Sequence, residues 1–168
     1  MLSNYYGTAT PLISMGFGGD VEKFMGDGLM ATFNTRGDQP DHASRAARAG
    51  LELQRQMRRL AAAHPDWPEA RVGVNSGKAV VRELGGPGFI EYAVVGDTVN
   101  VGSRLEGEAP IGGVLIGAGT YSRLPADADV KPRPGLAVKG KRDRVDAYVL
   151  NDLPSPTIEK RRHAVRTH

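Results

Sequence analysis

Two short segments of this 168-residue chain carry side chains that together suit a metal-bound phosphate. The first runs from Lys23 to Gly28 and places Asp27 between two glycines. At such a turn a backbone can approach a phosphate, and a carboxylate can reach a hard cation such as Mg²⁺. The second, from Gly96 to Arg104, places Asn100 and Arg104 four residues apart, on one face of a helix. Together these segments indicate chemistry on a nucleoside triphosphate.

Each segment also has a purely structural interpretation. Aspartate favours hairpin turns for its own local hydrogen bonds, so Asp27 alone does not identify a metal ligand. Asp97 stands at a helix start, where an N-cap is the simpler role. The planar donors of Arg104 suit phosphate and the Asn100 amide can orient a ribose or phosphate oxygen, but a solvated helix face is the alternative. The functional interpretation depends on the two segments occurring together.

Composition indicates one soluble globular domain, with 40% apolar and 24% charged residues. No run approaches the roughly 20 apolar residues of a membrane span, and the first residues do not open a signal peptide. The absence of cysteine excludes disulfides and thiolate metal sites. A reducing cytoplasm is therefore the default expectation.

Charge is unevenly distributed along the chain. Residues 1–130 hold 12 Lys/Arg against 15 Asp/Glu, whereas residues 131–168 hold 10 against 4. We interpret the basic end as a solvated terminus rather than a nucleic-acid-binding tail, because no aromatic side chain follows Tyr148 to stack on bases. Domain boundaries are expected at 1–152 for the folded domain and 153–168 for a basic, flexible tail.

Hydrophobic periodicity predicts the elements that position the two segments. A helix ends within residues 4–13, and strands 20–24 and 29–33 flank the Gly26-Asp27-Gly28 hairpin turn. A long helix starts near N-cap candidates at Asp38 to Asp41 and ends at His64 to Pro68. The remaining elements are strands at 71–75, 79–84 and 89–95, a helix at 97–108, a buried strand at 114–116, a short helix at 118–123 and a closing strand at 148–150. Mixed hairpins and helices predict an α+β sandwich.

The order of the motifs resembles a known family. It is Lys-x-x-Gly-Asp, then Arg71-x-Gly73-x-x-x-Gly77, then Gly-Asp-x-Val-Asn-x-x-x-Arg-Leu-Glu, with a late Val138-Lys139-Gly140-Lys141. This order resembles the catalytic domain of class III nucleotidyl cyclases, the adenylyl and guanylyl cyclases, over about residues 4–150. The resemblance implies a ferredoxin-like, palm-type βαββαβ sandwich. It further implies a dimer with its active sites at the subunit interface, and two Mg²⁺ or Mn²⁺ ions per site.

The same resemblance implies a reaction and a role for each matching residue. The ribose 3′-hydroxyl of ATP attacks the α-phosphate, and pyrophosphate leaves. Asp27 corresponds to a metal aspartate and Lys23 to the lysine that reads the purine. Asn100 corresponds to the residue that orients the ribose, and Arg104 to the one that neutralises charge in the transition state.

The late lysines and Ala93 leave alternatives open. Either Lys139 or Lys141 corresponds to the residue that holds the terminal phosphates. Ala93 stands where the family commonly has Asp or Thr as the partner of Lys23 in purine selection, and its methyl group makes no hydrogen bond. Selection of ATP then depends mainly on Lys23, so GTP remains the alternative substrate.

The start of the chain is the second departure from the family. Members carry a first metal aspartate on an opening central strand, in Phe-x-Asp-x-x-Gly, whereas Met1 to Tyr6 already resemble a later helix. We therefore expect an N-terminally truncated domain with one metal aspartate and weak or no activity. The alternatives are a non-catalytic cyclase homology domain, which binds nucleotide or forms a heterodimer with an intact cyclase, and an unfolded remnant with exposed sheet edges.

Overall fold

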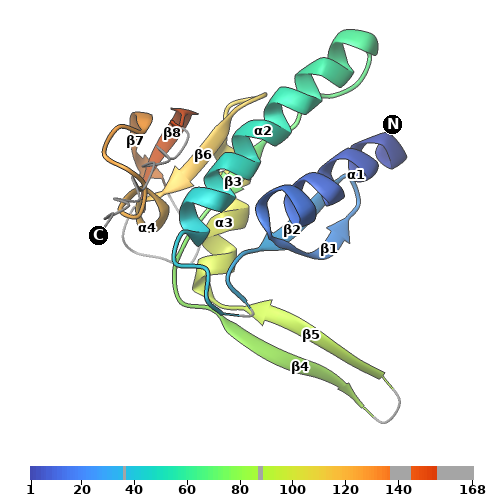
Figure 1. The fold of residues 1–168 in the computed structure, drawn as a ribbon, viewed down its shortest axis with the longest axis vertical. Coiled ribbons are helices and arrows are strands. Elements are labelled where there is room, and N and C mark those ends of the chain that lie inside the picture. The colour runs from blue at the N-terminus through green and yellow to red at the C-terminus, as the bar shows by residue number, and fades with distance from the viewer. Residues whose placement is uncertain (36, 87–88, 137–144, 155–168) are drawn as a thin grey trace, which may run out of the picture.

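Helices cover both faces of a four-stranded mixed sheet, and two separate hairpins lie beside it (Figure 1). This computed structural model describes residues 1–35, 37–86, 89–136 and 145–154. The mixture of sheets and helices confirms the predicted α+β class. The described strands nevertheless form three separate sheets, and β2 and β3 each have one edge without a partner strand in this part of the chain.

The first hairpin is preceded by a helix, as predicted. Helix α1 (Leu2–Pro11) runs into a π-helical turn, η1 (Leu12–Gly16), at the point where Pro11 lacks a backbone N–H. Strands β1 (Asp20–Met25) and β2 (Gly28–Thr32) then pair antiparallel. Gly26 adopts φ +65° in the turn between them, a conformation that glycine adopts without strain.

The four-stranded sheet has the order β3-β6-β8-β7. Strands β3 (Val72–Val74) and β6 (Val114–Gly117) are parallel, whereas β8 (Val145–Asp152) is antiparallel to both β6 and β7 (Asp129–Leu136). Sequence analysis did not foresee β7, because Pro132 and Pro134 argue against a strand. Its position at the edge of the sheet explains how both prolines are accommodated.

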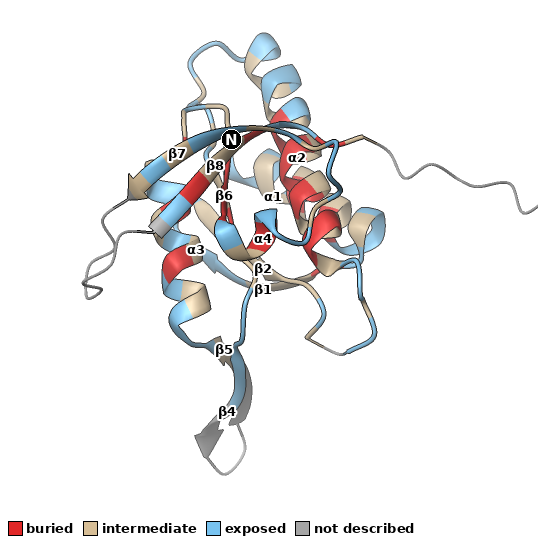
Figure 2. Cartoon of the chain, turned by 90° about the vertical axis from the view of Figure 1, so that its left-hand side faces the viewer, coloured by how far each residue is buried: buried red, intermediate tan, exposed pale blue. Residues whose placement is uncertain are grey.

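Two helices bury the two faces of this sheet. Val114 and Ile116 pack with α2 (His42–Ala63), whereas Leu115 packs with α3 (Asp97–Glu108). This alternation follows from the period of two along a strand. Figure 2 shows the buried residues along α2 and α3 on either side of the sheet. The α3 helix is therefore held by a core of its own.

The second hairpin projects from the body of the protein as an arm (Figure 1). Strand β4 (Val80–Gly86) pairs antiparallel with β5 (Phe89–Val95). Strand β4 and the preceding β3 therefore belong to different sheets, a separation that the predicted strands at 71–75 and 79–84 did not indicate. Short helix α4 (Ala118–Tyr121) follows β6 and packs against it and β8.

The expected N-cap residue of α2 is present but does not cap the helix. Asp41 occupies the N-cap position of α2, but its carboxylate accepts a hydrogen bond from Arg45 Nε at 2.7 Å instead of capping the helix. This bond lowers the pKa of Asp41.

Leu153 is buried and Arg48 donates to the carbonyl of Pro154, while residues 155–168 lie outside the described part of the chain. No helix in the described residues is long and apolar enough to cross a membrane.

Buried Gln54 ties α2 to both of the loops that lead into β3 and β6. Its side chain is 2% exposed, and Nε2 donates to the carbonyls of Ala70 at 3.1 Å and Gly113 at 2.8 Å. Gln54→Leu leaves two carbonyls without this donor, so we expect the free energy of unfolding to fall by about 2 kcal/mol in urea titrations. Gln56→Leu is the matched control on the same helix, because among the described residues the Gln56 side chain bonds only to Glu52; we expect a loss below about 0.5 kcal/mol. Equal losses of unfolding free energy in the two variants would contradict a stabilising role for the two hydrogen bonds of Gln54.

Candidate active site

The turn that carries Asp27 is held from α1. The hydroxyl of Tyr6 donates to the carbonyl of Gly26 and lies 3.4 Å from that of Gly28. The Tyr6 ring also packs on Phe24, with centroids 4.5 Å apart. One side chain thus contacts the backbone on both sides of Asp27 and leaves the Asp27 carboxylate exposed.

Neighbouring Tyr5 reports how acidic these surroundings are. Burial raises the pKa of the Tyr5 phenol, and Tyr6 and the carboxylates of Asp27 and Glu106 raise it further. Asp27 belongs to the hairpin and Glu106 to α3. Tyr5 therefore lies within electrostatic range of both elements that carry predicted site residues.

Helix α3 presents Asn100 and Arg104 on a face beside its core. Val101 and Leu105 are 5% and 1% exposed and anchor the helix against the sheet, whereas Asn100 is exposed and Arg104 half-buried. Their separation of four residues places them one turn apart. Neither side chain makes a hydrogen bond or an ion pair to another described residue. An amide and a guanidinium on one open face can bind the ribose and phosphates of a nucleotide.

The seat of α3 is a backbone-to-backbone contact with β3. A Cβ on Gly73 would stand 2.3 Å from the backbone nitrogen of Glu106 and 2.5 Å from the carbonyl oxygen of Gly102. Only a residue without a side chain allows this approach. The glycines of the Arg71-x-Gly73-x-x-x-Gly77 motif thus have a packing role that their spacing alone did not identify.

Two polar side chains in this region were missed by sequence analysis. Asn75 Nδ2 donates to the carbonyl of Thr98 at 3.0 Å, and the Thr98 hydroxyl donates to the carbonyl of Lys78. The sequence signal was their position within the glycine motif and at the helix start. Asp97, expected to be an N-cap, is instead the first residue of α3, and Gly96 is the N-cap.

The other predicted residues lie on separate elements. Lys23 is exposed on β1, four residues before Asp27. Ala93 lies half-buried on β5 of the arm, in register with Arg82. Lys139 and Lys141 lie outside the described residues. The structure therefore groups Lys23 with Asp27 on the hairpin, and Asn100 with Arg104 on α3. No hydrogen bond or ion pair joins the two groups within the described chain.

Asp27 fits a metal that arrives with its nucleotide. The described residues contain no group of three or more His, Asp or Glu side chains arranged around a cation. Mg²⁺, however, is usually bound by one or two carboxylates together with substrate phosphates. The carboxylate is exposed, and a Cβ at neighbouring Gly26 would meet nothing within 4 Å, so the approach is open.

Residues 6–152 match the adenylate and guanylate cyclase catalytic domain family. Adenylate cyclase 1 of Rhizobium meliloti is 32% identical over 155 residues, which cover 88% of this chain and 23% of that protein. The crystal structure of the guanylyl cyclase Cya2 superimposes with a TM-score of 0.83 at 28% identity, over 94% of this chain and 81% of that one. The adenylyl cyclase CyaB from P. aeruginosa gives 0.81 at 28% identity, over 91% and 81%. The chain spans about a quarter of the Rhizobium relative's length.

The Gly73 contact yields a direct prediction for stability. Gly73→Ala inserts a methyl group between β3 and α3, so we expect the free energy of unfolding to fall by about 1–3 kcal/mol. Gly107→Ala, on α3, is the matched control, because a Cβ there would meet nothing within 4 Å. That change should leave stability unchanged or raise it by about 0.5–1 kcal/mol. Denaturant titration of both variants checks this, and a neutral Gly73→Ala would contradict the close contact.

Proposed function

The chain belongs to the adenylate and guanylate cyclase catalytic domain family, and we propose that it converts ATP to cyclic AMP and pyrophosphate. The observation that carries the proposal is the open face of α3, on which Asn100 and Arg104 stand one turn apart without partners in the described chain. The hairpin adds an exposed carboxylate and a lysine, the two further groups that such a reaction requires. We expect the reaction in the cytoplasm, where ATP is available.

In the proposed reaction, the ribose 3′-oxygen forms a bond to the α-phosphorus while the bond from that phosphorus to the pyrophosphate oxygen breaks. The 3′-hydroxyl loses its proton to solvent, and the cyclic ester forms. Bound Mg²⁺ or Mn²⁺ would lower the pKa of the attacking hydroxyl and stabilise the leaving oxygens. Asp27 would supply a metal ligand, and Asn100 would hold the ribose so that its 3′-oxygen faces the phosphorus.

Three further contributions complete the proposed site. Arg104 would donate hydrogen bonds to the α-phosphate, where negative charge grows in the transition state. Lys139 or Lys141 would bind the terminal phosphates. Lys23 would bind the purine and select ATP. GTP is the alternative substrate, because Ala93 offers no side-chain hydrogen bond to help discriminate between the two bases. Relatives of both specificities, an adenylate cyclase of Rhizobium meliloti and a receptor-type guanylate cyclase of Caenorhabditis elegans, leave this choice to experiment.

A homodimer is part of the proposal, with the hairpin of one subunit facing α3 of the other. The arm supports it, because a two-stranded hairpin that projects from the body is marginally stable without a partner. At its base Val80 and Val81 are 55% and 51% exposed and Val95 is 36% exposed. These valines are suited to burial against a second copy of the chain.

Val81→Glu should therefore weaken the dimer. A carboxylate buried in an apolar interface is costly, so we expect the dissociation constant from analytical ultracentrifugation to rise at least about 10-fold. Ile111→Glu is the matched control, because Ile111 is 65% exposed in a loop away from the arm. A dimer that Val81→Glu leaves intact would place the interface elsewhere.

The isolated polypeptide should turn over ATP slowly. The physical reason is that the turn of the hairpin offers one exposed carboxylate, Asp27, to a reaction in which two metal ions take part. Incubation of the purified chain with MnATP, and separately with MnGTP, followed by quantification of the cyclic nucleotides, measures this rate. Arg104→Ala should lower any measured turnover by about 100-fold or more. Rapid turnover that Asp27→Ala abolishes would contradict the expected weak activity.

A second candidate function is to form a heterodimer with an intact cyclase, in which this chain supplies α3 to one site. It is favoured by the complete Asn100 and Arg104 pair on α3. The arm, in contrast, departs from the family at Ala93, where members commonly have Asp or Thr. In that role the chain would restore one site to a partner cyclase whose own asparagine and arginine have been replaced by alanine. Mixing the two and measuring cyclic AMP tests it; no recovery would remove this role.

A further inference from the structure

The turn that follows β3 contacts the first turn of α3 through side chains that have no role in the proposed chemistry. Asn75 is the residue after β3, and its Nδ2 donates to the carbonyl of Thr98 at 3.0 Å. Gly117 makes room for this amide, because a Cβ there would stand 2.4 Å from Asn75 Oδ1.

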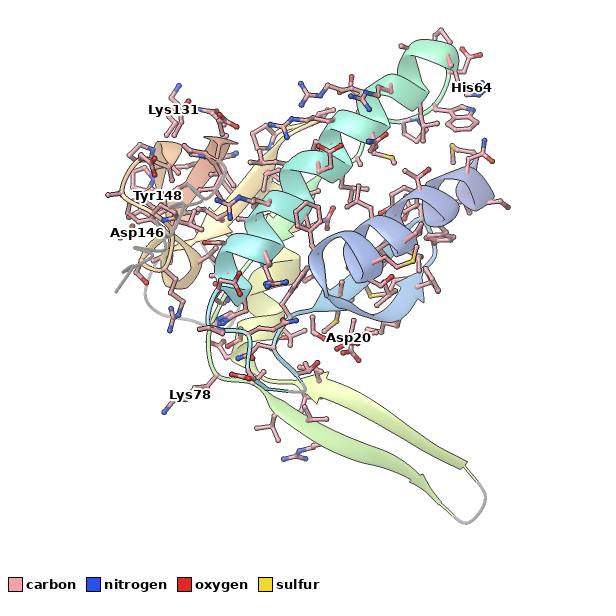
Figure 3. The ribbon with its side chains drawn as sticks, in the orientation of Figure 1. Asp20, His64, Lys78, Lys131, Asp146 and Tyr148 are labelled. Atoms are coloured by element: carbon pink, nitrogen blue, oxygen red, sulfur yellow. The ribbon has the colours of Figure 1, made fainter. Side chains whose placement is uncertain are left out.

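Thr98 returns the contact in the opposite direction. Its hydroxyl donates to the carbonyl of Lys78, at the root of the arm, whose own side chain points outward (Figure 3). Gly77 makes this possible, since a Cβ there would stand 2.7 Å from Thr98 Oγ1. The backbone of α3 thus accepts a bond from the turn, and the helix side chain donates one to the turn.

These two bonds act at the first turn of α3. The N-cap residue is Gly96, and no side chain caps the helix. The first turn of an uncapped helix frays readily. Asn100 lies only two residues beyond Thr98, so the orientation of the first turn sets the direction in which Asn100 points.

We propose that Asn75 and Thr98 are positioning residues for the nucleotide site, because their paired bonds fix the rotation of α3 that aims Asn100 and Arg104 at the substrate. This inference rests on the proposed role of α3 in nucleotide binding. It assigns the polar residues around Gly77 to alignment of the helix rather than to contact with substrate. It also links the root of the arm to the site through the Lys78 carbonyl.

Thr120, on α4, provides a matched control whose hydroxyl contacts the same turn. It is fully buried, its hydroxyl donates to the carbonyl of Val74 at 3.3 Å, and it lies 3.0 Å from the Ser76 hydroxyl. These bonds attach the turn to α4 rather than to α3. Thr120→Val and Thr98→Val therefore each remove a hydroxyl that bonds to this segment from a neighbouring helix, but only the second releases the first turn of α3.

The test measures the affinity of the dimeric chain for α,β-methylene-ATP with Mn²⁺ by calorimetric titration, alongside the melting temperature of each variant. Thr98→Val and Asn75→Leu each remove one bond, so we expect the dissociation constant to rise about 3- to 10-fold. Thr98→Ser keeps the hydroxyl and should restore affinity to within about twofold. Thr120→Val should lower the melting temperature but leave affinity within about twofold of the wild type.

The variants distinguish the failure of this inference from the failure of the proposed function. Asn100→Ala that leaves affinity unchanged would contradict the role of α3, and with it the positioning role. Asn100→Ala that weakens binding while Thr98→Val and Asn75→Leu do not would overturn the positioning role alone. Equal losses in Thr120→Val and Thr98→Val would also overturn it, because they would show a general effect of stability.

Discussion

The structure depends on how closely α3 approaches β3. With no side chain at Gly73, backbone atoms of Glu106 and Gly102 occupy the space that a Cβ would fill. This contact lets Val101 and Leu105 reach the sheet and turns Asn100 and Arg104 away from it. Because protein interiors are close-packed, a shift of the helix would be felt along its whole length. The geometry of the proposed phosphate-binding face therefore depends on Gly73, which packs against the backbone of α3.

The same arrangement explains why the candidate site residues lie in two separate groups. The α3 helix belongs to the four-stranded sheet, whereas Asp27 and Lys23 belong to a hairpin sheet of their own. Tyr6 anchors the Asp27 turn to α1, and Asn75 with Thr98 anchors the first turn of α3 to the end of β3. Each half is locally well held, and no described hydrogen bond or ion pair joins their site residues. Two copies that face each other would bring unlike halves together twice, as a symmetric dimer requires.

Local signals in the sequence were sufficient to predict most elements but not their association. The hairpin at Gly26 to Gly28, the long α2 helix and α3 follow from turn residues and periodicity, and all three are confirmed. Strand β7 was missed because Pro132 and Pro134 obscure it, and only its edge position makes them acceptable. The division of β3 and β4 between sheets could not be predicted, because pairing is a long-range property. For the site, residue types and order pointed to the family that the comparisons support, whereas the contacts of Asn75, Thr98 and Tyr6 required coordinates.

The central claim, a nucleotide site shared between two subunits, is tested most directly by mixing two defective variants. Asp27→Ala removes the hairpin half and Arg104→Ala the α3 half, and each alone should fail to bind α,β-methylene-ATP with Mn²⁺. In an equal mixture, half of the dimers would be mixed and each would hold one intact site of two, so binding should recover to about one quarter of the wild-type stoichiometry. A mixture that binds no better than either variant alone would contradict the shared site.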